Sequence, residues 1–241
     1  MKKLTDAEIF REKDFPFDCM FGRFHMTYPK HTHEFTEIVF VLNGTSREII
    51  NGQEYPMKRG TVAILSGSDT HETVWAANST SFLVRYDPHV LGIDSDEMRK
   101  LPGYNALFVR PPGLNDRGMV PRVIELDDTT YASAEGIVRR MSEEFTEKPE
   151  GYRVQIRALL TEYVVLFCRN VTETSPVAIQ PYIRLEKALI HIERNFSEKI
   201  TLDDLTSITG IEERTLERAF RAVTGHSPIE YLIRFRIAKA S

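Results

Sequence analysis

Three histidines and one glutamate in the first third of the chain are of the types that bind divalent transition metals. His31, His33 and Glu37 follow the pattern HxHx3E, so a continuous strand would point their side chains to one face. His71 comes eleven residues after Gly60, which precedes a predicted strand. Neutral imidazole nitrogens and a carboxylate oxygen together suit Zn, Ni, Fe or Mn. These residues predict either a divalent-metal site inside a barrel or direct hydrogen bonds to a small ligand.

Four further residues are candidates for lining a ligand pocket. Trp75, the only tryptophan, could stack on the apolar face of a sugar or fill the core. Tyr28, Tyr55 and Arg85 are the other candidates. An enzyme would also need a base beside its substrate, and the sequence nominates none. We therefore predict a binding site that requires no cofactor, with a metalloenzyme that uses the four ligands above as the alternative.

Arginines recur on one helical face near the carboxyl terminus. Arg214, Arg218 and Arg221 lie at positions i, i+4 and i+7, so they share an exposed face. A short helix and a glycine break precede them, which is the layout of a helix-turn-helix. The planar guanidinium can bond guanine O6 and N7 together in a major groove. This pattern predicts a DNA-reading helix, and the alternative is ion pairing with Glu213 and Glu217 on a solvated surface.

The elements that must position the histidines read as short strands. Between residues 37 and 86, apolar runs alternate with turn residues, which is typical of an antiparallel sandwich or barrel. Asn51-Gly52 is a strong hairpin signal because both residues tolerate the positive φ of a type I′ turn. Residues 87–125 are rich in proline and glycine, and we expect loops there with one short strand around 106–109.

Helical periodicity governs the rest of the chain. Apolar stripes over residues 134–145 and 156–167 predict a helical hairpin, and the second stripe could bury against a second copy or against its own barrel. A proline-punctuated linker follows, and four helical stretches then begin near Ile183, Leu202, Glu213 and Pro228.

Composition and charge narrow the class of protein. With 241 residues, 41% hydrophobic and 27% charged, the chain suits two folded domains. The net charge of −4 offers no overall attraction to polyanions, so a basic patch must be local. The two cysteines are far apart, and no secretory signal or membrane-length apolar run is visible. These features predict a cytoplasmic protein without membrane contact.

Two signatures in the last sixty residues resemble the DNA-binding domain of the AraC/XylS family. Residues 216–220 carry the pattern LxRxF, and residues 225–232 carry GxSPxxYL. The resemblance implies that Arg214, Glu217 and Arg218 read the DNA groove, with Arg221 on the same face. It also implies a small effector bound in a cupin barrel, commonly without metal.

Two departures from the family pattern change what we expect. Glu212 stands where the family usually has a serine N-cap, and glutamate caps a helix poorly. The family's domain has two helix-turn-helix units, whereas this chain stops inside or just past the connector that begins at Pro228. Losing half of the phosphate contacts predicts weakened DNA binding. A truncated sensor that dimerises with full-length relatives but cannot bind DNA alone is therefore a further alternative.

The barrel has a resemblance of its own. His31, His33, Glu37 and Gly44 resemble the first cupin motif, and residues 101–108 and 151–153 look like the sugar-responsive branch of the AraC family, near the rhamnose regulators. These resemblances imply a sugar as effector and a dimer formed through the helix over residues 153–169.

The combined prediction is an α+β protein with an N-terminal antiparallel β-barrel or sandwich, cupin-like, and a C-terminal all-α helix-turn-helix domain. The expected parts are an effector-binding barrel over 1–127, a dimerising helical hairpin over 128–172, a linker over 173–182 and a partial AraC-type DNA-binding domain over 183–241. We expect a homodimer that regulates transcription by binding DNA and a small effector.

Overall fold

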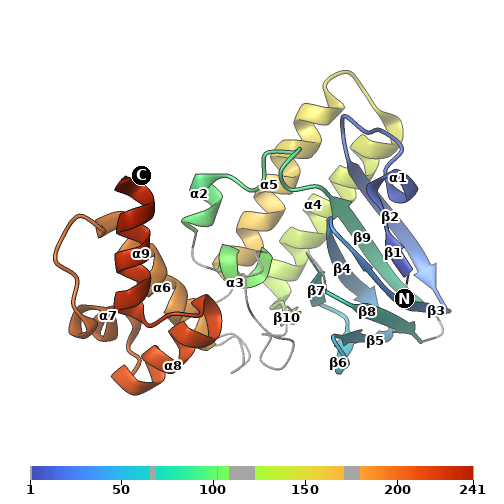
Figure 1. Cartoon of the computed structure of the whole chain (residues 1–241). Helices are drawn as coiled ribbons and strands as arrows, with labels where there is room; N and C mark the ends of the chain where they lie inside the picture. The colour runs from blue at the N-terminus through green and yellow to red at the C-terminus, as the bar shows by residue number, and fades with distance from the viewer. Residues whose placement is uncertain are drawn as a thin grey trace. The chain divides into compact units, whose positions relative to one another are not determined.

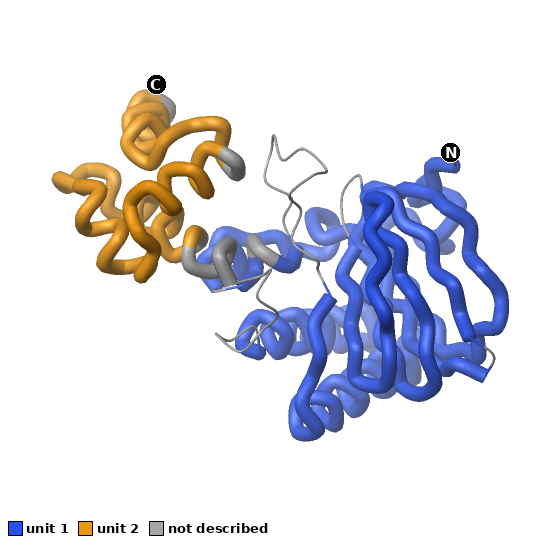
Figure 2. The backbone as a smooth tube through the Cα atoms, turned by 90° about the horizontal axis from the view of Figure 1, so that it is seen from below, with its two compact units in different colours: residues 1–109, 121–171 blue, residues 110–120, 172–241 orange. Residues whose placement is uncertain are grey.

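The computed structural model of the chain describes residues 2–65, 69–76, 78–101, 103–108, 123–170 and 180–240. The chain divides into two compact units, one formed by residues 1–109 and 121–171 and the other by residues 110–120 and 172–241 (Figure 2). Each unit has its own buried core. We describe them in turn, because each positions a different set of candidate residues.

The first unit contains two five-stranded sheets (Figure 1). One sheet has the order β1 (Lys2–Leu4), β3 (Thr27–His33), β8 (His71–Trp75), β5 (Thr45–Ile50) and β6 (Gln53–Lys58). The other has the order β10 (Val123–Glu125), β7 (Thr61–Leu65), β4 (Thr36–Asn43), β9 (Ser79–Tyr86) and β2 (Phe17–Phe24). All neighbours pair antiparallel except β1 and β3. The predicted antiparallel sandwich followed by a helical region is confirmed.

Strand β4 is buried on both of its faces. Val39 and Val41 belong to the interior core cluster, whereas Phe40 contacts Tyr131 of the helix α4 (Asp128–Glu147) edge to face. A strand that is covered on both sides reads as a continuous apolar run rather than as an alternation. The run over residues 38–42 therefore has its physical reason in this double burial.

Helices α4 and α5 (Tyr152–Asn170) pack against the same unit. Phe145 of α4 contacts Phe17 of β2 edge to face. The apolar stripe of α5 is already buried within its own unit. The stripe consists of Ile156, Leu159, Leu160, Tyr163, Val164 and Phe167. The area of this stripe has therefore already left water inside one chain, as the second of the two alternatives predicted. Dimerisation through the hairpin over residues 128–172 stays a prediction and would need another surface of it.

The strand expected around residues 106–109 is also wrong. Residues Tyr104–Phe108 form helix α3, which follows the shorter α2 (Asp96–Arg99), and Val109 lies outside the described residues. Tyr104, Leu107 and Phe108 sit at i, i+3 and i+4 and are all buried, so one turn of helix places them on one face. Gly103 enters this turn with φ at +84°, which a side chain would resist.

The second unit consists of α6 (Gln180–Asn195), α7 (Leu202–Thr209), α8 (Glu213–Thr224) and α9 (Pro228–Ala240). Its core is apolar and includes Leu185, Ile192, Leu205, Leu216, Phe220 and Leu232. Helix α6 begins inside the predicted linker, because a proline in the first turn removes only an N–H that has no helical partner. No helix in the described part of the chain is long and apolar enough to cross a membrane.

The helix-turn-helix geometry has clear local causes. Thr201 and Asp204 form a reciprocal capping box at the start of α7. Gly210 ends α7 in the left-handed region with φ at +63°, which lets the chain turn at once into α8. Leu216 and Phe220 of α8 then face the core, Ala219 packs against it, and Arg218 is exposed.

Candidate functional site

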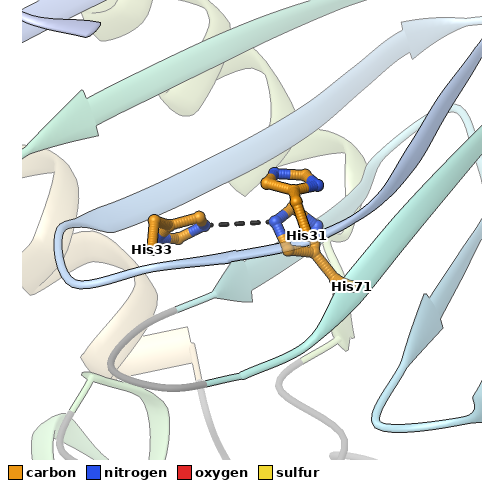
Figure 3. Close-up of side chains that lie close together, drawn as sticks. All are labelled: His31, His33 and His71. Carbon is orange, nitrogen blue, oxygen red and sulfur yellow. Dashed lines mark hydrogen bonds between the residues drawn. The ribbon is translucent and has the colours of Figure 1, made fainter. Parts of the chain in front are cut away.

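Three imidazoles meet inside the first unit (Figure 3). His31 and His33 lie on β3, and His71 lies on the neighbouring strand β8, directly paired with His31. All three side chains are buried. Each offers a nitrogen, and these three nitrogens lie within 4.8 Å of one another. The fold thus brings together the HxH pair and the distant histidine that the sequence nominated.

Backbone carbonyls orient two of the three rings. His31 Nδ1 lies 2.9 Å from the carbonyl oxygen of Pro29, and His33 Nδ1 lies 2.8 Å from that of Phe35. A carbonyl oxygen only accepts, so in both rings Nδ1 donates its hydrogen and Nε2 keeps a free lone pair. Nε2 of His33 lies 3.1 Å from Nε2 of His71, on the strand next to its own.

This donor set fits a divalent metal. Two nitrogens bound to one metal at about 2.0–2.1 Å lie roughly 2.9–3.4 Å apart. The 3.1 Å between the Nε2 atoms of His33 and His71 falls within that range. Two lone pairs that face each other at this distance repel unless a proton or a cation lies between them. The triad His31, His33 and His71 could therefore hold a metal.

Burial keeps the imidazoles neutral, as metal or ligand binding requires. Burial lowers the pKa of His33 to about 4, and the partial restoring effect of Glu37 does not offset it. Burial also lowers the pKa of His31 and of His71. Near pH 7 all three rings are thus in the neutral form, which donates a lone pair.

Glu37 reaches the interior by a different route from the one expected. A single strand over residues 31–37 is wrong, because β3 ends at His33 and β4 begins at Thr36 in the other sheet. The carboxylate of Glu37 is buried beside Arg85, with Oε2 3.1 Å from Nε as an ion pair that lacks hydrogen-bond alignment. Burial raises the pKa of Glu37. Arg85 and the imidazoles together lower this pKa by more than burial raises it, so the net shift is downward.

The metal-compatible group among the described residues contains the three imidazoles and does not include Glu37. Its carboxylate is engaged with Arg85, whose Nη1 also lies 3.7 Å from Asp18 Oδ2. A role for Glu37 as a metal ligand stays a prediction. The observed arrangement is a buried ion pair next to a neutral triad.

A cavity of about 70 Å³ opens beside His31, whereas His33 and His71 are not part of its lining. Five of the predicted pocket residues line it, namely Tyr28, His31, Glu37, Trp75 and Arg85. Trp75 lines this cavity and also stacks on Phe24 with ring centroids 4.6 Å apart, whereas its role in stacking on a sugar stays a prediction. Tyr55 is not part of this lining and packs half-buried against the core cluster.

The cavity is small for a ligand site. Its volume corresponds to about two water molecules at roughly 30 Å³ each, whereas ligand pockets usually enclose about 300–1,000 Å³. A sugar-sized molecule would need the cavity to widen. Leu4 of β1 and Met20 of β2 lie on the lining, so short or edge elements form part of the wall.

Sequence reasoning missed Glu48, a charged residue of the interior. Glu48 of β5 is fully buried, and neither of its carboxylate oxygens makes an aligned hydrogen bond in the described part of the chain. Burial raises the pKa of Glu48 well above the ordinary value, and the opposing effect of the neighbouring Thr73 does not offset it. The alternation of Ser46, Glu48 and Ile50 on one face of β5 was the available signal.

The predicted DNA-reading residues lie on the surface of α8. Arg214, Arg218 and Arg221 are exposed, and Glu217 is partly exposed. Among the described residues, no ion pair joins these three arginines to a carboxylate. The alternative of internal ion pairing with Glu213 and Glu217 is thus not what the structure shows.

Two further features of this unit bear on the sequence interpretation. Glu212 occupies the N-cap of α8 without a side-chain hydrogen bond, as a poorly capping residue would. Arg236 does not add to a free basic surface, because its guanidinium donates to the carbonyl oxygens of Phe196 and Glu198, each at 2.6 Å. It therefore links α9 to the segment that follows α6.

Comparison with known proteins gives a family match and distant relatives. Residues 15–163 match the family model of the AraC-like ligand binding domain, which is more than half of the chain. The HTH-type transcriptional activator RhaS of Enterobacter sp. (strain 638) is 27% identical over 213 residues, or 88% of this chain and 72% of the relative. RhaS of Escherichia fergusonii is 26% identical over 215 residues, with the same shares.

A solved structure also resembles the chain. The crystal structure of the AraC-like transcriptional activator CuxR matches with a TM-score of 0.37 and 16% sequence identity. The match covers 86% of this chain and 67% of that chain.

Proposed function

The chain belongs to the AraC family of transcriptional regulators with a ligand-binding domain, and from this premise we propose that a small effector in the barrel controls its binding to DNA. One observation carries the proposal. The same chain buries an unusually polar barrel interior and exposes arginines, free of ion pairs among the described residues, on a helix-turn-helix. The first arrangement suits a small polar molecule and the second suits a polyanion.

The effector that this interior suits best is a polyhydroxylated molecule such as a sugar. Imidazole nitrogens and the Glu37–Arg85 pair offer both acceptors and donors to hydroxyl groups. Trp75 adds an apolar face that sugars can stack on. His31, His33, His71 and Tyr28 complete the proposed contacts, and Tyr55 joins them only if the cavity extends toward β6.

The DNA contact in this proposal runs through α8. Arg214, Glu217 and Arg218 read base edges, and Arg221 contributes a phosphate or base contact on the same face. The exposure of the arginines and the burial of Leu216 and Phe220 support this division of the helix. We further propose that the protein acts in the cytoplasm as a homodimer, with a surface other than the apolar stripe of α5.

Regulation requires that the effector bind two arrangements of the protein with different affinity. The cavity of about 70 Å³ supports such a difference, because an arrangement that admits a sugar must be wider than the one seen. Binding energy of the effector then stabilises the wider arrangement. By linkage, DNA that favours that arrangement tightens effector binding by the same factor.

The test is a linked binding measurement with the full chain. DNA selected from a random pool is titrated by fluorescence anisotropy at fixed salt, with and without each of a panel of sugars. We expect one sugar to change the DNA affinity by about 5–150-fold and the selected DNA to change the affinity for that sugar equally. Failure to enrich any DNA sequence, or sugar binding that leaves DNA affinity unchanged, would overturn the proposal.

A second candidate function rests on the imidazole triad. A divalent metal held by His31, His33 and His71 would supply a Lewis acid, and the chain would then act as a cupin metalloenzyme. The residues hold the three rings neutral and oriented, but no catalytic base is evident. Stoichiometric metal in protein purified without chelators, together with turnover of a bound substrate, would favour this candidate over the regulator.

A further inference from the structure

His71 stands between two partners on the two strands that flank it. In the sheet, β8 lies between β3 and β5. On the β3 side, His71 Nε2 faces His33 Nε2 at 3.1 Å. On the β5 side, His71 Nδ1 lies 3.7 Å from Glu48 Oε2, and both side chains are fully buried.

The other two imidazoles show what this second partner does. His31 and His33 each have an acceptor oxygen at Nδ1, supplied by a backbone carbonyl. Such a partner fixes the tautomer and turns the Nε2 lone pair toward a common point. At His71 the structure places the carboxylate of Glu48 on the Nδ1 side, without an aligned hydrogen bond.

We propose that Glu48 is a positioning residue for His71, whose carboxylate accepts the Nδ1 hydrogen and so presents Nε2 to a divalent cation shared with His31 and His33. This inference rests on the second candidate function, the metal triad. Glu48 does not itself coordinate the ion. It completes a set in which each of the three rings has one oxygen behind it and one free nitrogen in front.

Removing the acceptor changes the preferred hydrogen bond. Without an oxygen at Nδ1, the best partner for His71 is His33, so His71 donates from Nε2 to the Nε2 lone pair of His33. That hydrogen bond occupies both atoms that the metal needs.

The experiment measures Co²⁺ and Zn²⁺ affinity of the full chain by competition with a chromophoric chelator. Glu48→Leu is expected to lower both affinities by about 10–100-fold, the effect of losing a group that orients a metal-bound histidine. Glu48→Gln keeps an acceptor oxygen and is expected to retain most of the affinity. Glu54→Leu, which removes an exposed carboxylate of β6 that pairs with Arg47 of β5, is the matched control and should leave affinity unchanged.

Two further readouts separate positioning from folding. The melting temperature of metal-free Glu48→Leu should stay level or rise, since it removes a buried carboxyl that lacks an aligned partner. In the Zn²⁺-loaded wild type, ¹⁵N NMR should show His71 protonated at Nδ1. Equal metal affinity of Glu48→Leu and wild type would overturn the inference alone, whereas no metal binding by wild type would overturn it together with the metal triad. Neither outcome would contradict the proposal that an effector in the barrel controls DNA binding.

Discussion

The two units of the chain bury opposite kinds of side chain. The interior of the first unit contains imidazoles, carboxylates and a guanidinium, several of them without aligned hydrogen bonds among the described residues. The core of the second unit is apolar, and its buried Thr209 and Ser227 have backbone partners. Buried groups without partners reduce stability, so their retention points to a use for them. This contrast agrees with the proposal that the first unit binds a ligand on its inside and that the second binds DNA on its outside.

The largest predicted effect tests whether the second unit depends on its apolar core alone. Phe220 is completely buried there, so Phe220→Ala should lower the free energy of unfolding of this unit by about 3–5 kcal/mol. Urea unfolding followed by circular dichroism at 222 nm measures the loss.

Trp75 supplies an internal control for that measurement. It is the only tryptophan and lies in the first unit, so its fluorescence reports that unit's unfolding. We expect the fluorescence transition to keep its midpoint in Phe220→Ala. An equal shift of both transitions would contradict the picture of two separately stabilised cores.

The second prediction concerns how the free energy of unfolding of the barrel falls at low pH, because its buried imidazoles resist protonation in the folded state. His33 has a pKa of about 4 in the folded protein against 6.5 unperturbed, so the unfolded state binds its proton first as the pH falls. The contribution of His33 is complete above pH 6.5 and is lost as the pH falls toward 4. The loss is roughly 3 kcal/mol, since one pKa unit corresponds to about 1.4 kcal/mol.

Unfolding of metal-free protein, monitored by Trp75 between pH 7 and 4, checks this expectation. His33→Asn removes one titrating group and should make the profile shallower over that range. A variant whose stability falls as steeply as that of wild type would show that other groups, such as His31 and His71, whose pKa values burial also lowers, determine the pH dependence.

The sequence predicted the helices and strands better than it predicted which surfaces they pack against. The helical stripe of α5 was visible in the spacing of its apolar residues, but nothing in that spacing says which surface covers it. The convergence of His31 and His33 with His71 was expected, whereas the side-chain parity argument for Glu37 failed at the break between β3 and β4.

Glu48 shows where single-sequence reasoning ends. Its position behind His71 depends on the pairing of β5 with β8, which places Ile50 opposite His71. The two strands are separated by a hairpin and by β7, and their register is set by the packed sandwich rather than by any local signal. The alternation of residues along a strand predicts which face of the sheet a side chain such as Glu48 lies on. It does not predict which side chain of the neighbouring strand lies beside it.

A third prediction tests the exposed arginine face of α8 in the second unit. Arg218→Ala should weaken binding to selected DNA by about 1–3 kcal/mol and relax the base preference at one position. Arg194→Ala, which removes an exposed arginine of α6, is the matched control and should reduce affinity less and equally for all sequences. Loss of affinity without any change in base preference would reassign Arg218 to a phosphate contact.

The smallest predicted effect asks whether polar groups in the second unit add stability where those inside the barrel reduce it. Thr201 caps α7 by accepting from the Asp204 N–H, so Thr201→Ala should lower the free energy of unfolding by about 1 kcal/mol. Ser207 lies exposed within the same helix, and Ser207→Ala should instead raise it by a few tenths of a kcal/mol, because alanine is the better helix former. Opposite signs from the same loss of a hydroxyl, measured by urea unfolding at 222 nm, would assign the difference to the cap. Equal signs would mean that the capping box contributes nothing beyond helix propensity.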